Sequence, residues 1–176
     1  MKGLRYIRIL PAAILVLLLS GCGGNSSFEL APGYVILDKK KPVESVEEML
    51  SLLPDSPVYL DSWATWCAPC REEFRYYDSL RPFFREHDIH VLYLNTDSYL
   101  EEADWFDFIR EHQLEGYHLR LTQKLQRSLI DEKLFLPLIP QFMIIDSAHR
   151  VLEKNALRPS DLDSLKLQMT MLLDLK

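Results

Sequence analysis

Two cysteines stand two residues apart in the segment 62–73, which reads SWATWCAPCREE. The chain has three cysteines in all, so Cys67 and Cys70 could ligate a metal, staple the fold or form a redox pair. A tetrahedral zinc site needs four ligands, usually from two such pairs; the chain has no second pair, and its five histidines are scattered. A disulfide between residues three apart constrains little of the unfolded chain, which makes it a poor staple. The spacing therefore predicts a redox pair.

The position of the motif predicts which cysteine attacks. An apolar run at 58–60 precedes it and apolar residues at helical spacing follow it, so the pair lies where a strand meets a helix. The free N–H groups and the positive end of the helix dipole favour a thiolate at Cys67, which we expect to be exposed and nucleophilic. Cys70 lies one turn further on, where we expect it to be buried and to resolve the mixed disulfide.

The apolar pattern predicts alternating strands and helices around this junction. The order strand, helix, strand from 58 to 94 makes a βαβ crossover and therefore a parallel pair, with Pro82 kinking or dividing the helix. Ser160 and Asp163 resemble a capping box ahead of the last helix. We expect strands at 34–37, 58–60, 89–94, 117–121, 142–145 and 151–152, and helices at 42–53, around 70–84, around 101–112, at 122–133 and around 162–172.

The N-terminus has the layout of a secretory signal. Positive residues precede the apolar run 9–19, which is well short of the roughly 20 residues that span a bilayer. The run ends in LSGC at 19–22, which resembles the lipobox of bacterial lipoproteins. We expect residues 1–21 to be removed, Cys22 to carry a lipid, residues 22–32 to form a flexible tether, and residues 33–176 to form one domain.

The charge of the chain argues against a nucleic-acid partner. Removal of the signal takes away three of the 20 basic residues and no acidic one, so the net charge falls from −6 to −9. An acidic domain without a basic run repels phosphate backbones and anionic lipid. We therefore expect the domain to contact the bilayer only through the lipid on Cys22.

The stretch WATWCAPC at 63–70 resembles the active site of the thioredoxin superfamily. The resemblance is closer still to its TlpA/ResA-like branch, whose members are extracytoplasmic thiol-disulfide oxidoreductases and are usually tethered to a membrane. It implies an α/β, thioredoxin-like fold over residues 33–176, with a central mixed β-sheet flanked by helices on both faces. The chain departs from the family at Gln141, where threonine is frequent, and at His149, where glycine is common.

The resemblance also implies further site residues. Pro140 matches the superfamily's cis-proline better than Pro137 does, so we expect a cis Ile139–Pro140 bond beside the cysteines. Asp61 resembles the buried acid beneath the disulfide, and Glu73 resembles the acid one turn beyond the second cysteine. Burial raises the pKa of a carboxyl group, so either acid could take the proton of the resolving thiol. The residues expected to contact the substrate are Trp66, Ala68, Pro69, Ile139 and Pro140.

These features predict an enzyme that reduces disulfides in protein substrates on the extracytoplasmic, periplasmic side of a membrane. We expect its electrons to come from a membrane or periplasmic donor, and we expect no cofactor and no metal besides the cysteine pair. Two alternatives stay open. One is a disulfide oxidase or isomerase, because the reduction potential of the pair decides the direction of electron flow. The other is a delivery protein that holds copper or another soft metal on the same cysteines.

Overall fold

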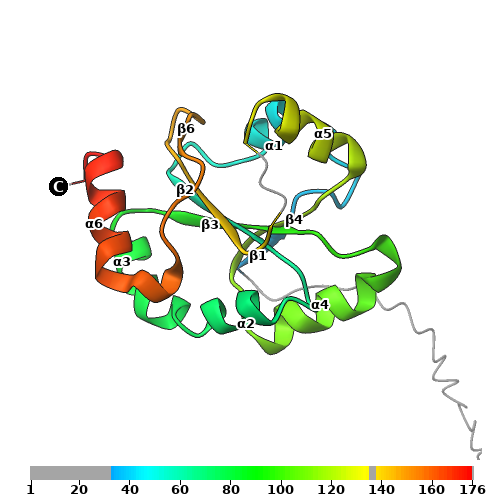
Figure 1. Ribbon diagram of the computed structural model, residues 1–176, viewed down its shortest axis with the longest axis horizontal. Coiled ribbons are helices and arrows are strands. Elements are labelled where there is room, and N and C mark those ends of the chain that lie inside the picture. The colour runs from blue at the N-terminus through cyan, green and yellow to red at the C-terminus, as the bar shows by residue number, and fades with distance from the viewer. Residues whose placement is uncertain (1–32, 135–137, 176) are drawn as a thin grey trace, which may run out of the picture.

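The computed structural model describes residues 33–134 and 138–175, which form a six-stranded sheet with helices on both faces (Figure 1). The expected signal and tether, residues 1–32 with Cys22, lie outside the described residues, as does Pro137. The strands are β1 (Tyr34–Ile36), β2 (Val58–Trp63), β3 (His90–Asn95), β4 (Gly116–Arg120), β5 (Gln141–Ile145) and β6 (Val151–Glu153). The helices are α1 (Val46–Ser51), α2 (Ala68–Phe74), α3 (Tyr77–Glu86), α4 (Glu102–Glu111), α5 (Gln123–Asp131) and α6 (Leu162–Leu172), with 3₁₀ turns η1 (Tyr99–Glu101) and η2 (Pro159–Asp161).

The sheet has the order β1-β4-β3-β2-β5-β6 and is mixed. Strands β1 to β4 pair in parallel, and β5 runs antiparallel to β2 and to β6. The predicted α/β fold with a mixed sheet is confirmed, and so is the parallel pairing of the strands that flank the cysteine helix. β2 pairs with β3 on one side and with β5 on the other. Both neighbouring strands therefore help to fix the position of the segment that follows β2.

Two apolar cores lie on the two faces of the sheet. Val58 and Leu60 of β2 belong to the core under α1 and α5, whereas Tyr59 and Trp63 belong to the core under α2, α3, α4 and α6 (Figure 1). Alternate residues of a strand point to opposite faces, so Asp61 faces the same side as Tyr59 and Trp63. Burial of each large apolar side chain contributes about 1.5–3 kcal/mol to stability. The sheet therefore holds Asp61 rigidly on the face that carries the cysteines.

The division of the long helix differs from the prediction. Pro82 lies inside α3 and does not break it; the break falls at Arg75 and Tyr76. The N–H groups of these two residues bond the carbonyls three positions earlier, Glu72 and Glu73, which tightens the backbone and ends α2. Both helices nevertheless bury side chains in one core, among them Phe74 and Tyr77.

The predicted capping box at Ser160 is wrong. Ser160 lies within η2, and α6 begins at Leu162 after Asp161. The Ser160 backbone N–H and hydroxyl instead donate hydrogen bonds to Glu73, which lies 87 residues earlier in the chain. The tertiary hydrogen bonds to Glu73 therefore take the place of the local helix cap that the sequence pattern predicted.

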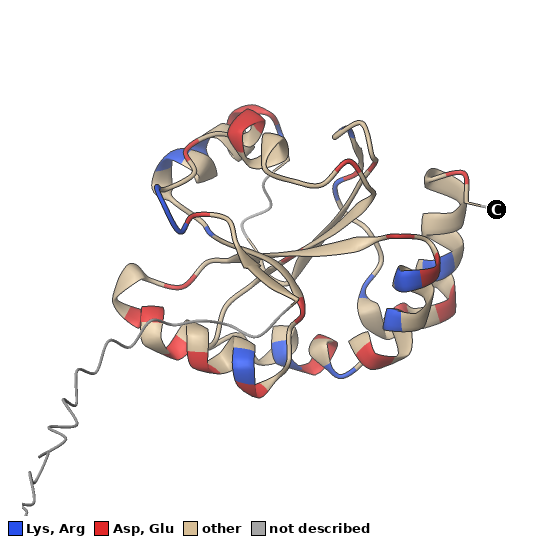
Figure 2. Cartoon of the chain, turned by 180° about the vertical axis from the view of Figure 1, so that it is seen from behind, with Lys and Arg blue, Asp and Glu red and all other residues tan. Residues whose placement is uncertain are grey.

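Charged residues lie mainly on the helices and loops that surround the sheet (Figure 2). Acidic and basic side chains are interspersed there, and several form exposed pairs such as Arg75–Glu72 and Lys124–Glu44. Pairs of this kind contribute little to stability, because water and salt screen them. Among the described residues, no helix is both long and apolar enough to cross a bilayer.

Candidate active site

The two cysteines lie just beyond the carboxyl end of β2, at the start of α2, and a disulfide joins them. Cys67 is the N-cap of α2, and its sulfur accepts a hydrogen bond from the backbone N–H of Cys70, 3.2 Å away. Pro69 stands in the first turn of the helix, where the missing N–H of proline costs no intrahelical bond. In the reduced protein, a thiolate at Cys67 would still accept the hydrogen bond from this N–H and would lie at the positive end of the helix. Both interactions lower the pKa of a cysteine.

Burial of the pair differs from the expectation in one respect. Cys70 is buried, as expected, but Cys67 is also only 4% exposed, because it packs in the aromatic-rich core beneath α2. The exposed part of the motif is Trp66, at 64%, followed by Ala68 and Pro69. A substrate would therefore meet these three residues before it reaches the sulfur of Cys67.

The loop between β2 and the motif is tied to the end of the neighbouring strand. The backbone N–H of Thr65 donates to both carboxylate oxygens of Asp97, at 3.1 and 3.0 Å. The Asn95 side chain donates to the same carboxylate at 2.8 Å. Sequence reasoning missed Asp97; the signal was the polar run Asn95–Asp97 directly after a buried strand that is parallel to β2.

Asp61 lies in β2, on the face of the sheet whose apolar core contains both cysteines, and is 1% exposed. Burial raises the pKa of its carboxyl to about 8, a hydrogen bond from Tyr77 opposes the rise, and the charge of Glu73 adds to it. The Tyr77 hydroxyl donates to Oδ2 at 2.8 Å, while Oδ1 is buried with no hydrogen-bond partner among the described residues. A carboxyl group that titrates near neutral pH can take up and release a proton under ordinary conditions.

Glu73 is also buried, but its surroundings differ from those of Asp61. One carboxylate oxygen accepts the Ser160 N–H at 2.9 Å and the other accepts the Ser160 hydroxyl at 3.2 Å, and Arg158 lies 3.8 Å away. These contacts join α2 to the segment before α6. Glu73, a residue of the cysteine helix itself, therefore ties α2 to η2.

The loop that contains Pro140 lies at the same end of the sheet as the cysteine motif. The Ile139–Pro140 bond is cis, which confirms the expectation. Gln141, the next residue, begins β5 and pairs with Ser62 of β2, and Ile139 packs against the core that contains both cysteines. Leu138 is 76% exposed. The residues expected to contact a substrate therefore come from two loops at one edge of the sheet.

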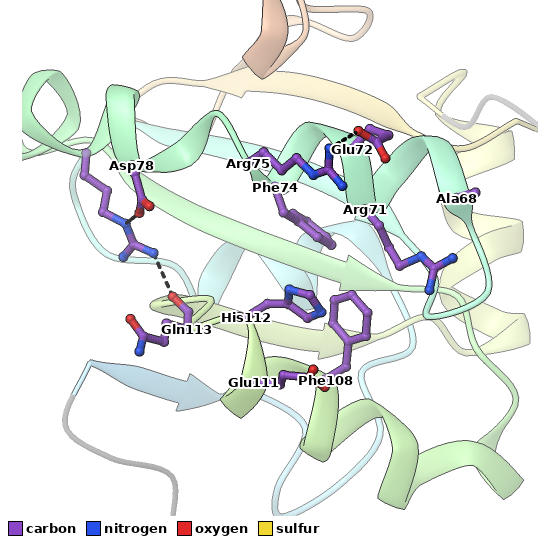
Figure 3. Close-up of a pocket in the computed structure, with 11 residues that line it drawn as sticks. Ala68, Arg71, Glu72, Phe74, Arg75, Asp78, Phe108, Glu111, His112 and Gln113 are labelled. Atoms are coloured by element: carbon purple, nitrogen blue, oxygen red, sulfur yellow. Dashed lines mark hydrogen bonds and ion pairs between the residues drawn. The ribbon is translucent and has the colours of Figure 1, made fainter.

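A pocket of about 720 Å³ opens beside the motif, between α2–α3 and α4 (Figure 3). Ala68 lines the pocket at the end next to the cysteines, and Phe74 and Phe108 form an aromatic wall. The His112 ring stacks on the Phe108 ring, with 4.0 Å between the ring centroids. Arg71 lies at its rim. The pocket leaves room beside the disulfide for part of a bound molecule.

Metal-ligating side chains do not cluster in the part of the chain that the structure describes. Within residues 33–134 and 138–175, no three residues among His, Cys, Asp and Glu are grouped so that they could hold a metal ion. The described site contains a cysteine pair, a buried carboxyl group and the N–H groups at the start of α2.

Comparisons with known proteins point to one group. No family model matches the chain. The thiol-disulfide oxidoreductase ResA of Bacillus thuringiensis is 29% identical over 103 residues, which cover 51% of this chain and 57% of the relative. ResA of Geobacillus kaustophilus is 33% identical over 66 residues, which cover 38% of this chain and 36% of the relative. The chain thus covers 57% of the length of the first of these relatives and 36% of the second.

Solved structures extend the match over more of the chain. The solution structure of a candidate thiol-disulfide oxidoreductase from Bacteroides vulgatus is 30% identical, covers 70% of this chain and 78% of its own, and superposes with a TM-score of 0.56. A thioredoxin domain of another thiol-disulfide oxidoreductase from the same organism is 19% identical, covers 68% and 80%, and has a TM-score of 0.55, which supports the fold.

Proposed function

The chain belongs to the thioredoxin superfamily, in its ResA-like group, and we propose that it is an extracytoplasmic thiol-disulfide oxidoreductase that reduces disulfides in protein substrates. The observation that carries the proposal is the Cys67–Cys70 disulfide at the start of α2, with the buried carboxyl group of Asp61 on the same face of the sheet. Because electrons can enter and leave through the two sulfurs alone, the reaction needs no cofactor and no metal.

The reaction begins with the reduced protein. The Cys67 thiolate attacks one sulfur of a substrate disulfide, and the other substrate sulfur leaves as a thiolate. The Cys70 thiol then gives its proton to Asp61 and attacks the Cys67 sulfur, which breaks the mixed disulfide and releases the second substrate thiolate. The substrate gains two electrons and the protein is left as the Cys67–Cys70 disulfide. A membrane or periplasmic dithiol donor then restores the reduced form.

The exposed residues around the sulfur suit a polypeptide substrate. Trp66 offers an amphipathic ring, and Leu138 and Ile139 of the proline loop offer further apolar surface. An extended substrate segment can pair with the backbone beside Pro140, which directs a cysteine toward Cys67. The pocket that starts at Ala68 provides room for a neighbouring substrate side chain.

The direction of electron flow can be tested directly. The reduction potential of the Cys67–Cys70 couple, measured by equilibration with a glutathione or dithiothreitol buffer, is expected below about −200 mV, in the range of reductants such as thioredoxin. The same protein should speed the reduction of insulin disulfides by dithiothreitol, and the Cys67→Ser variant should not. A potential near −120 mV, that of a strong oxidant, would replace reduction by oxidation as the function.

We further propose that Cys22 anchors the domain to a membrane and takes no part in the redox reaction. The charged start, the short apolar run and LSGC at 19–22 support this proposal. Expression of the full chain in a bacterium should place the wild type in the membrane fraction and Cys22→Ser in the soluble fraction. The soluble variant is expected to keep wild-type insulin reductase activity. An inactive but folded Cys22→Ser protein would contradict the separation of the anchor from the chemistry.

A further inference from the structure

Three tyrosines lie near the carboxyl group of Asp61, and one of them donates a hydrogen bond to it. Tyr59 of β2 and Tyr93 of β3 are buried near Asp61, whose charge adds to the effect of burial in raising the pKa of both hydroxyl groups. The Tyr59 hydroxyl donates its hydrogen bond to the carbonyl oxygen of Leu157, at 2.7 Å, and not to Asp61. The Tyr77 hydroxyl of α3 donates to Asp61 Oδ2 at 2.8 Å.

A small cavity adjoins Tyr77 between α3 and the start of β3. It measures about 200 Å³, and Tyr77 and Tyr93 line it together with charged residues such as Arg85 and Glu115. The Arg85 side chain is 74% exposed, so the cavity joins the tyrosines to the solvent. A water molecule takes about 30 Å³ of liquid volume, so a cavity of this size holds several.

The charged and titratable groups that face Asp61 leave one short route to water. Glu73 faces it from α2 and is bonded to Ser160, while Tyr59 is bonded to a backbone carbonyl. Tyr93 faces it from β3, and Arg81 influences Tyr93 from α3. Among the described residues, Tyr77 alone combines a hydrogen bond to the carboxyl group with a place in the cavity wall.

Building on the proposed function, we propose that Tyr77 relays the proton of Asp61 to water in the cavity behind it. As Cys70 gives its proton to the carboxylate, the Tyr77 hydroxyl rotates and accepts the proton of the carboxyl group on its oxygen, so the relay is part of the resolving step. The hydroxyl passes its own proton to a water molecule in the cavity, so one proton leaves and no other bond changes. Tyr77 acts through Asp61 and does not touch the sulfur atoms, which makes it a positioning residue.

The relay gives the buried acid a way to reset. A carboxyl group that is 1% exposed cannot exchange its proton with bulk water directly. The hydroxyl of a buried tyrosine stays protonated, since burial raises the pKa of Tyr77 well above its ordinary value. It can therefore donate and accept in turn without becoming charged for long.

The test compares Tyr77→Phe with the matched control Tyr59→Phe in the full chain. Reduced protein is mixed with a small disulfide between pH 5 and 9, in H₂O and in D₂O, and tryptophan fluorescence follows the two steps. Formation of the mixed disulfide should be unchanged in both variants, because Cys67 does not use Asp61. Resolution of the mixed disulfide by Cys70 should slow about tenfold in Tyr77→Phe, which is part of the roughly 100- to 10,000-fold that general acid–base catalysis contributes. The pH profile and the solvent isotope effect of this step should also change. Tyr59→Phe should behave as the wild type.

The outcomes separate the relay from the proposed function. A wild type that forms no mixed disulfide would remove the function and the relay together. A wild type that completes both steps, with Tyr77→Phe keeping its rate, pH profile and isotope effect, would overturn the relay alone. An equal slowing in Tyr59→Phe would also overturn it. If Tyr77→Phe does not fold, Asp61→Asn is compared with Asp61→Asn/Tyr77→Phe. The relay predicts equal resolution rates for these two, and a difference would contradict it.

Discussion

Replacement of Cys70 by serine is expected to stop the reaction at the mixed disulfide and leave the substrate covalently attached to Cys67. The hydroxyl of serine cannot attack the Cys67 sulfur, so the intermediate has no internal exit. Cys67 keeps its place as N-cap of α2, with the N–H of residue 70 still pointing at its sulfur. The attacking thiolate and its stabilisation by the helix therefore survive the change.

The measurement is a trapping experiment on the full chain. Reduced Cys70→Ser is mixed with a disulfide-bonded protein such as insulin, and non-reducing gels with mass spectrometry identify the adduct. We expect an adduct at Cys67 that dithiothreitol releases, and turnover that falls to the uncatalysed background. Cys67→Ser is the matched control and should give neither turnover nor adduct. Adducts on Cys70 in the Cys67→Ser variant, with none on Cys67 in Cys70→Ser, would reverse the two roles.

The central strand and the cysteine pair could be predicted because their signals are local. The apolar run before the motif identifies β2, and the apolar spacing after it identifies the helix that begins beside Cys67. These two features depend on residues within a few positions of one another, so periodicity and residue type were sufficient. Asp61 was expected from the resemblance to the thioredoxin superfamily, and the structure places it inside β2.

The polar partners of the site could not be predicted, because distant parts of the chain supply them. Ser160 reaches Glu73 across 87 residues, and Asp97 reaches Thr65 across 32. Tyr77 has the spacing of a core aromatic residue, and periodicity cannot tell that its hydroxyl ends at Asp61. The exposure of Cys67 was wrong for a related reason, since a helix dipole says nothing about which neighbours cover the sulfur.

Asp61→Asn is expected to raise the free energy of unfolding and to slow the resolving step at the same time. The buried carboxyl group has a pKa of about 8 in the folded protein against 3.8 for the ordinary group. Between these values the unfolded chain has lost the proton while the folded protein keeps it, so the stability of the wild type falls as pH rises from about 4 to 8. Asparagine carries no titratable group and should remove this slope.

The stability gap between Asp61→Asn and the wild type should therefore depend on pH. It should vanish below pH 4, where the carboxyl group is neutral in both states, and reach at most about 4 kcal/mol at pH 7. Urea unfolding of the oxidised proteins at pH 4, 6 and 8 measures it. Glu73→Gln is the matched control, because glutamine can still accept one bond from Ser160. Most of the slope should remain in this variant, since burial is the main cause of the raised pKa of Asp61 and the charge of Glu73 a lesser one. A gap that stays constant from pH 4 to 8 would mean that Asp61 titrates normally and is not the buried acid described above.

The same substitution should act on the second chemical step and spare the first. Asparagine cannot take the proton of Cys70, so the mixed disulfide should persist and its resolution should slow by about 10- to 100-fold at pH 9, where Asp61 of the wild type is ionised. Attack by Cys67 should keep its rate, because the N–H groups at the start of α2 are untouched. Stopped-flow fluorescence with a small disulfide separates the two steps, and Glu73→Gln should resolve the intermediate at the wild-type rate. If Glu73→Gln is slow and Asp61→Asn is fast, the proton of Cys70 goes to Glu73, and its bonds to Ser160 must open during turnover.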